Sequence, residues 1–195
     1  MMVYFMLCLK NNKILFGLLA FFLFVNNVFA IEEDNSIKIY NFNLSKGKVN
    51  YLMSCNLEFI FTDEVNKAIK KGIPFIFQVN VRIVEERNFW IDKLVHKVQG
   101  VFKLKYKSLR QVYEVVDVHG QKIEFDNISG ALKYLSNIKN WALSLSIPSD
   151  QGEYKLILNV KLDRKKLPKP LQVNFFSQSW NIESPLIEYP LGILI

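Results

Sequence analysis

The sequence predicts a mainly β fold, an antiparallel sandwich or curved sheet of about eight strands with two short covering helices. Several segments alternate apolar and polar residues, which is the period of a strand with one buried face. Turn-forming residues separate these segments, as between strands of an antiparallel sheet. Only two segments have apolar residues at helical spacing. Many strands and few helices favour a layered β architecture.

The alternation is clearest between residues 49 and 61, where every odd-numbered residue is apolar. This period places Cys55 in the core as a small buried residue. Seven further strands are expected at about 37–44, 73–84, 89–106, 109–118, 122–125, 141–147 and 154–162. Gly100 lies within one of them and suggests a bulge or a bend. Short closing strands are expected at 171–176 and 180–182, and the apolar tail from Pro185 is either an exposed patch or a final strand.

Two segments have the signals of short helices. In residues 62–72, Thr62 can cap the first turn, two acidic residues follow it, and Gly72 can end the helix. Residues 128–138 carry a second apolar stripe, and Asp126 and Asn127 are candidate caps. The stripe consists of Ile128, Ala131, Leu132, Leu135 and Ile138.

Residues 1–30 have the pattern of a secretory signal peptide. Lys10 and Lys13 precede an unbroken apolar run over residues 14–25, and Val28-Phe29-Ala30 resembles a cleavage site. The run is shorter than the roughly 20 residues that a membrane-spanning helix needs. We expect cleavage near Ala30, a periplasmic location, and one β-rich globular domain over residues 31–195. The alternative is a protein anchored in the membrane by its N-terminus.

The chain is basic, with a formal net charge of +7. Two groups of basic residues form a candidate interaction surface: three lysines on the outward face of the fourth strand, and four residues around a proline-bearing linker. They are Lys103, Lys105, Lys107, Arg164, Lys165, Lys166 and Lys169. Such a surface could bind anionic lipid or glycan. The alternative is that these side chains only keep the sheet soluble. Nucleic acid is not expected, because aromatic residues do not interleave with the lysines.

No catalytic, cofactor-binding or metal-ligating residues are predicted. His96 is expected on a strand and His119 in a turn, and neither belongs to a metal-ligand motif. Glu85 and Glu86 could act as paired carboxylates, but a solvated turn explains them as well. No nucleophile elbow or phosphate-binding glycine loop is present.

Five blocks of the sequence occur in the order found in one protein family. They are residues 67–77 (KAIKKGIPFIF), 104–115 (LKYKSLRQVYEV), Phe125 with Ala131-Leu132, residues 162–173 (LDRKKLPKPLQV), and Trp180 followed by Ser184. The chain thereby resembles a proteobacterial domain-of-unknown-function family of small exported proteins. Genes of that family often lie beside one for a nitrogen-regulation-type sensor histidine kinase. The resemblance implies a location in the bacterial envelope and, by analogy, association with a sensor kinase.

These observations favour an exported, non-enzymatic binding or interaction domain of the bacterial envelope. One alternative is a periplasmic carrier whose sheet and helices enclose an apolar ligand, and another is a hydrolase with a cryptic site. A carrier would have an unfilled space between sheet and helices. An interaction domain would have an exposed apolar patch or a free strand edge.

Overall fold

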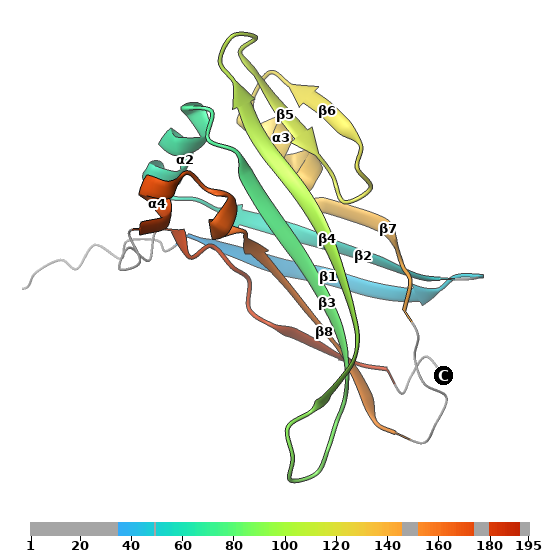
Figure 1. The fold of residues 1–195 in the computed structure, drawn as a ribbon. Helices are drawn as coiled ribbons and strands as arrows, with labels where there is room; N and C mark the ends of the chain where they lie inside the picture. The colour runs from blue at the N-terminus through green and yellow to red at the C-terminus, as the bar shows by residue number, and fades with distance from the viewer. Residues whose placement is uncertain (1–34, 49, 146–151, 174–179, 192–195) are drawn as a thin grey trace, which may run out of the picture. The chain divides into compact units, whose positions relative to one another are not determined.

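Two antiparallel sheets build the domain, which confirms the predicted fold class (Figure 1). The computed structural model describes residues 35–48, 50–145, 152–173 and 180–191. The described residues form nine strands: β1 (Ser36–Lys46), β2 (Tyr51–Ile60), β3 (Phe75–Glu85), β4 (Lys93–Lys107), β5 (Val112–Val116), β6 (Lys122–Phe125), β7 (Asn137–Leu143), β8 (Tyr154–Leu162) and β9 (Ile187–Pro190). The smaller sheet has the order β1-β2-β7 and the larger the order β6-β5-β4-β3-β8-β9.

Two of the short helices carry the chain from one sheet to the other. Helix α2 (Asp63–Lys70) links β2 to β3, and helix α3 (Ile128–Leu135) links β6 to β7. In α2 the buried residues are Val65, Ala68 and Ile69, the stripe that the sequence predicts. The side chain of Asn127 caps α3 by accepting a hydrogen bond from the N–H of Gly130 at 2.7 Å. A 3-10 turn, η1 (Arg164–Lys166), and helix α4 (Lys169–Val173) follow β8.

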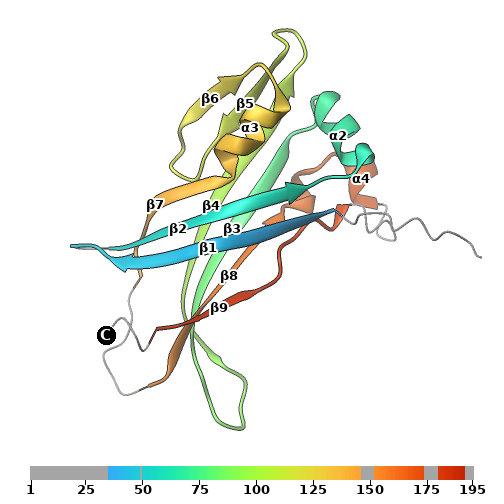
Figure 2. The same cartoon turned by 180° about the vertical axis from the view of Figure 1, so that it is seen from behind.

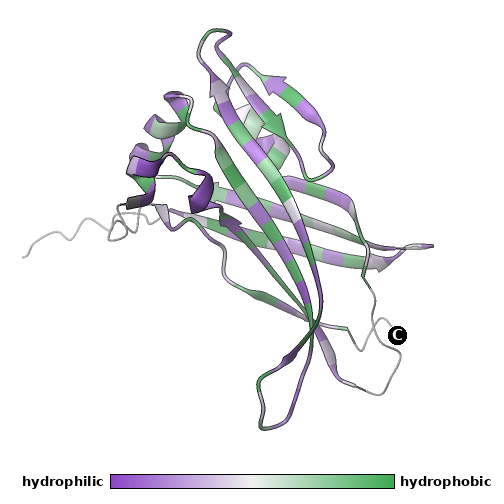
Figure 3. Cartoon of the chain, in the orientation of Figure 1, coloured by the Kyte–Doolittle hydropathy of each residue, from purple (hydrophilic) through white to green (hydrophobic). Residues whose placement is uncertain are grey.

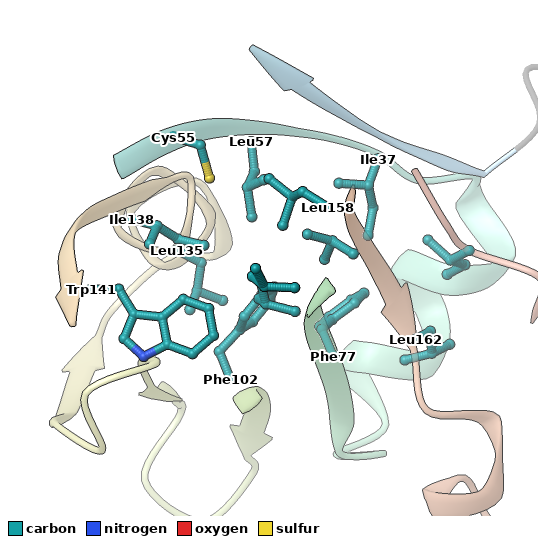
Figure 4. Packing of buried hydrophobic residues seen from close by; sticks show 14 of the residues in the cluster. Ile37, Cys55, Leu57, Phe77, Phe102, Leu135, Ile138, Trp141, Leu158 and Leu162 are labelled. Atoms are coloured by element: carbon teal, nitrogen blue, oxygen red, sulfur yellow. The ribbon is translucent and has the colours of Figure 1, made fainter. Parts of the chain in front are cut away.

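The core lies between the two sheets, whose strands cross rather than run side by side (Figures 1 and 2). Aromatic rings fill its centre, with Phe77 and Phe102 stacked at 5.0 Å between ring centroids and Phe59 5.6 Å from Phe77. Cys55 and Leu57 of the smaller sheet point toward these rings (Figure 4). Both are buried, as the alternation in residues 49–61 predicts.

Gly100 serves a different purpose from the predicted bulge. The pairing of β3 with β4 is regular there, with Val79 opposite Gly100, and the register shift lies at Ile83/Val84 instead. A Cβ atom added to Gly100 would lie 2.6 Å from Cζ2 of Trp141 on β7. Gly100 therefore lets the indole of the opposing sheet pack directly on the β4 backbone.

Two asparagines in the left-handed conformation mark bulges in the smaller sheet. Asn41 has φ 52° and Asn140 has φ 50°, and the register of β1 with β2 and of β2 with β7 shifts beside them. Because of the shift in β7, Ile138 and Trp141 both face the core although they are three residues apart. The predicted helix over 128–138 is therefore too long, and β7 (Asn137–Leu143) begins before the expected start of the seventh strand at 141. Residues 146 and 147 of the expected strand 141–147 lie outside the described residues.

Other expected boundaries also need correction. Strand β4 begins at Lys93, so residues 89–91 lie in the β3–β4 hairpin loop and not in a strand. The expected closing strands at 171–176 and 180–182 are wrong for the described residues, because 169–173 form α4 and β9 closes the sheet. Strands β3 and β4 alternate apolar and polar residues along their length, as Figure 3 shows. The expected signal peptide, residues 1–30, lies outside the described residues.

Candidate functional site

The three lysines of β4 lie on the outer face of the larger sheet, as predicted, but their surroundings differ. Lys103 is opposite Val116 on one side and Ile76 on the other, and it has no ion-pair partner among the described residues. Lys105 is opposite Glu114 in the register with β5. All three are half-buried. Neighbouring side chains therefore cover part of each lysine, as is usual for the aliphatic stem of a lysine on a sheet.

Lys107 has a partner within the fold. Its Nζ lies 2.5 Å from Oε2 of Glu114, and Nζ of Lys122 on β6 lies 2.6 Å from the same oxygen. Glu114 is buried, with 6% of its surface exposed. The Lys107 ammonium, followed by that of Lys122, lowers the pKa of the Glu114 carboxyl to about 2. Lys107 on β4 and Lys122 on β6 therefore neutralise a buried carboxylate of the strand between them.

The second basic group follows β8 and is held by a network of side-chain bonds. Asp163 accepts hydrogen bonds from Gln78 Nε2 at 2.7 Å and from the N–H of Lys165 at 3.2 Å. Gln172 Nε2 donates to the carbonyl of Lys165 at 2.9 Å, and Leu167 is buried beneath the segment. The backbone that carries the basic side chains is thus fixed on the sheet.

The structure brings the two basic groups together on the outer face of the sheet. The N–H of Asp163 bonds to the carbonyl of Ile76 at 2.7 Å, and Ile76 is also the partner of Lys103 in the register. Only strand β3 therefore separates Lys103 from the segment that begins at Asp163. We define the basic surface as Lys103, Lys105, Arg164, Lys165, Lys166 and Lys169.

A hollow of about 340 Å³ opens beside the basic surface. Its lining has three basic side chains, those of Lys161, Arg164 and Lys165, beside the carboxylates of Asp163 and Glu183. The lining residues are Gln78, Lys161, Leu162, Asp163, Arg164, Lys165, Asn181, Ile182 and Glu183. Lys165, Lys166 and Lys169 are exposed, and the described residues offer them no ion-pair partner.

The histidines lie in separate places. His96 is half-buried on β4 opposite Ile83. His119 lies in the β5–β6 turn, with Nε2 3.1 Å from the carbonyl oxygen of Lys139. Asp117 supports this turn and accepts a hydrogen bond from the Tyr134 hydroxyl at 2.7 Å. The described part of the chain contains no group of three or more His, Cys, Asp or Glu residues that could hold a metal ion.

The other titratable candidates are engaged in the fold. Oε2 of Glu85 lies 3.3 Å from Nζ of Lys93, and Oε1 of Glu86 lies 2.9 Å from Nζ of Lys155. Cys55 is buried, and this burial raises the pKa of its thiol to about 12. A thiol in that state is a poor nucleophile at neutral pH.

A second surface feature is not among those predicted from the sequence. Phe89, Trp90 and Ile91 in the β3–β4 hairpin loop are almost fully exposed, at 103%, 81% and 91%. The signal for it in the sequence is the run of three consecutive apolar residues between the charged residues 85–87 and Asp92. A half-buried strand would instead alternate apolar and polar residues. We call these three residues the hairpin tip.

A family model matches most of the chain. It is described as a domain of unknown function (DUF4390) and matches residues 34–189. The chain belongs to the DUF4390 family. The DUF4390 match contains strands β1 to β8 completely and ends within β9. No curated protein and no solved structure matches the chain. Among the described residues, no helix is long and apolar enough to cross a membrane.

Proposed function

We propose that this DUF4390 domain is an exported, non-enzymatic interaction domain that binds an anionic component of the bacterial envelope. The observation that carries the proposal is the basic surface. Two basic groups more than 50 residues apart in the sequence lie on either side of β3, and five lysines of the surface have no ion-pair partner among the described residues. Unpaired basic groups held together on a fixed backbone attract negative charge.

The chemistry recognised is a set of anionic groups, whether lipid phosphates or the acidic groups of a glycan. An acidic surface on a sensor kinase would have the same charge, and only the family resemblance suggests that partner. The carrier alternative finds less support, because Phe59, Phe77 and Phe102 fill the space between the sheets. A hydrolase finds less support because the two histidines belong to different parts of the fold: His96 lies on β4 opposite Ile83, whereas His119 lies in the β5–β6 turn beside Lys139.

Replacing Lys103, Lys165, Lys166 and Lys169 together with Gln tests the proposal. Gln keeps a polar side chain that is one atom shorter than that of Lys, and the variant spares Lys107 and Lys122, so that Glu114 keeps both partners. The control replaces Lys46, Lys48, Lys133 and Lys139 with Gln, four exposed lysines elsewhere that remove the same total charge. Binding of each protein to dextran sulfate and to phosphatidylglycerol vesicles is measured at low and high salt.

We expect the basic-surface variant to bind at least about tenfold more weakly than the wild type, since each basic residue near an anionic surface contributes about 1 kcal/mol. The control should lose much less, and the difference between them should shrink at high salt. Loss only with vesicles indicates lipid, and loss with dextran sulfate as well indicates a glycan-like polyanion. Equal losses in variant and control would contradict the proposal.

The proposed location is the periplasm, after cleavage near Ala30. The support is the basic, apolar and small-residue order of residues 10–30. Sequencing the N-terminus of protein from a periplasmic extract tests this location, and we expect a chain that starts near Ile31. A full-length product embedded in the membrane would contradict cleavage and favour the anchored alternative.

A further inference from the structure

The hairpin tip lies in the loop between β3 and β4, the two strands of the larger sheet that pair over the greatest length. This loop extends beyond the neighbouring strands (Figures 1 and 2). Its three side chains are adjacent in the chain and nearly fully exposed, and Leu94 behind them is 54% exposed. Single exposed apolar residues are ordinary, but a contiguous group that includes Trp and Phe marks a contact site. The tip is therefore a candidate contact site for another molecule.

The loop that carries the tip is held in a defined conformation. Glu85 and Lys93 are paired at its base, and the N–H of Glu86 bonds to the carbonyl of Glu153 at 2.8 Å. Phe89 itself has φ 69°, in the left-handed region that a residue of its size rarely adopts. Such a conformation at an exposed aromatic residue favours a functional role for the loop.

The charged side chains behind the tip form ion pairs with one another. Lys155 lies within ion-pair distance of three carboxylates, at 2.9 Å from Glu86, 3.2 Å from Asp92 and 3.1 Å from Glu188. Glu85 is paired with Lys93 at 3.3 Å. Four carboxylates face three basic groups here, Lys93, Lys155 and Arg87, so no positive charge is left over for an anionic surface. Contact at the tip therefore depends on its apolar side chains, and it should change little with salt.

We propose that the hairpin tip inserts into the interfacial region of a lipid bilayer. The tip is convex, and a bilayer accepts a convex apolar group without a shaped pocket. Trp and Phe are suited to this depth, where the ring meets both acyl chains and headgroups. The loop backbone has polar groups outside the sheet ladder, which restricts insertion to the headgroup level.

This inference goes beyond the proposed function, because the tip and the basic surface lie at opposite ends of β3. Ile76 pairs with Lys103 of the basic surface, whereas Glu85 is the last residue of β3 before the hairpin loop. They are nine positions apart in the sequence, which is about 30 Å along a strand. A domain inserted by its tip would hold the basic surface away from that bilayer, free for a different partner.

Quenching of Trp90 fluorescence by vesicles of brominated phosphatidylcholine tests insertion. The full chain has two other tryptophans, Trp141 and Trp180, and both are buried. In the wild type we expect strong quenching that persists at high salt. In a Trp90→Phe variant the remaining fluorescence should be unquenched, and in a Phe89→Ser/Ile91→Ser variant the quenching of Trp90 should fall several-fold. The substituted side chains are exposed, so all variants should keep the wild-type melting temperature.

Several outcomes would overturn the inference. An unquenched Trp90 would exclude insertion and leave a protein pocket as the occupant. A dimer of the wild type that the Phe89→Ser/Ile91→Ser variant loses, without lipid and without quenching, would assign the tip to a second copy of the chain. The same variant should bind dextran sulfate as the wild type does, so that failure of this inference and failure of the proposed function remain distinguishable.

Discussion

Replacing Gly100 with Ala should force the two sheets apart at one point. The new Cβ would lie 2.6 Å from Cζ2 and 2.7 Å from Cη2 of the Trp141 indole. Carbon atoms pack best at about 3.5–4.0 Å, so the overlap is roughly 1 Å at two atoms. The indole cannot simply turn into solvent at no cost, because Trp141 is 8% exposed and belongs to the core.

Overpacking of this kind typically costs about 1–3 kcal/mol. The loss of chain entropy that Ala brings to the unfolded state offsets about 0.4–1 kcal/mol of that cost where the backbone conformation is compatible. We therefore expect Gly100→Ala to lower the free energy of unfolding by about 1–2 kcal/mol. In a domain of this size the melting temperature should fall by roughly 2–8 °C.

Urea and thermal unfolding of the wild type, the two single variants and the double variant at positions 100 and 141 measure the effect. A Trp141→Leu variant removes the ring that the new methyl group meets, so adding Gly100→Ala to it should cost at most a few tenths of a kcal/mol. An equal cost of Gly100→Ala in the wild type and in the Trp141→Leu background would refute the reasoning. The methyl group would then act on the strand and not on the packing of the sheets.

Three further predictions concern single side chains. Leu57→Ala should destabilise the domain by about 2–5 kcal/mol in denaturant melts, because Leu57 is buried. Glu58→Ala on the exposed face should change the stability little. Equal effects would mean that the two faces of β2 are misassigned. Lys107→Gln should lower the free energy of unfolding by about 1–2 kcal/mol because buried Glu114 loses a partner. Lys103→Gln should change that free energy by no more than about 0.5 kcal/mol. The prediction fails if Lys103→Gln costs as much as Lys107→Gln. The folded pKa of Glu114 is lowered from 4.5 to about 2, so its contribution is present above pH 4.5 and is lost as the pH falls toward 2. Melts across this range should therefore show the difference between wild type and Glu114→Gln shrinking with acidification, and a difference that stays constant would contradict the pairing.

Much of the fold follows from period-two alternation. The alternation in residues 49–61 correctly assigns the buried face of β2, and the stripe of Val65, Ala68 and Ile69 correctly assigns α2. These elements are regular, so that each residue's face follows from its position in the sequence.

The alternation fails where the backbone is irregular. The bulge at Asn140 turns two residues three apart, Ile138 and Trp141, to the same face, which imitates helical spacing. Sequence spacing alone cannot distinguish that pattern from one more turn of helix. The same limit applies to Gly100, whose role depends on an indole from a strand that lies far away in the sequence.

The candidate site is partly predictable. Charge and spacing identify both basic groups, but only the register places Lys103 beside the segment at Asp163. The separate role of Lys107 depends on Glu114, which comes from a neighbouring strand. The hairpin tip is missed because its three apolar residues come just before β4 and are assigned to the start of that strand, although they do not alternate with polar residues.

We propose above that the protein acts by contact through its basic surface. Photo-crosslinking in living cells tests it most directly, with a crosslinking amino acid in place of Lys166 or, as a control, in place of Lys139; both side chains are exposed. The account predicts a discrete adduct from position 166 that is lost when Lys103, Lys165 and Lys169 are replaced by Gln, and little or none from position 139. Equal adducts from both positions, or an adduct from position 139 alone, would contradict it.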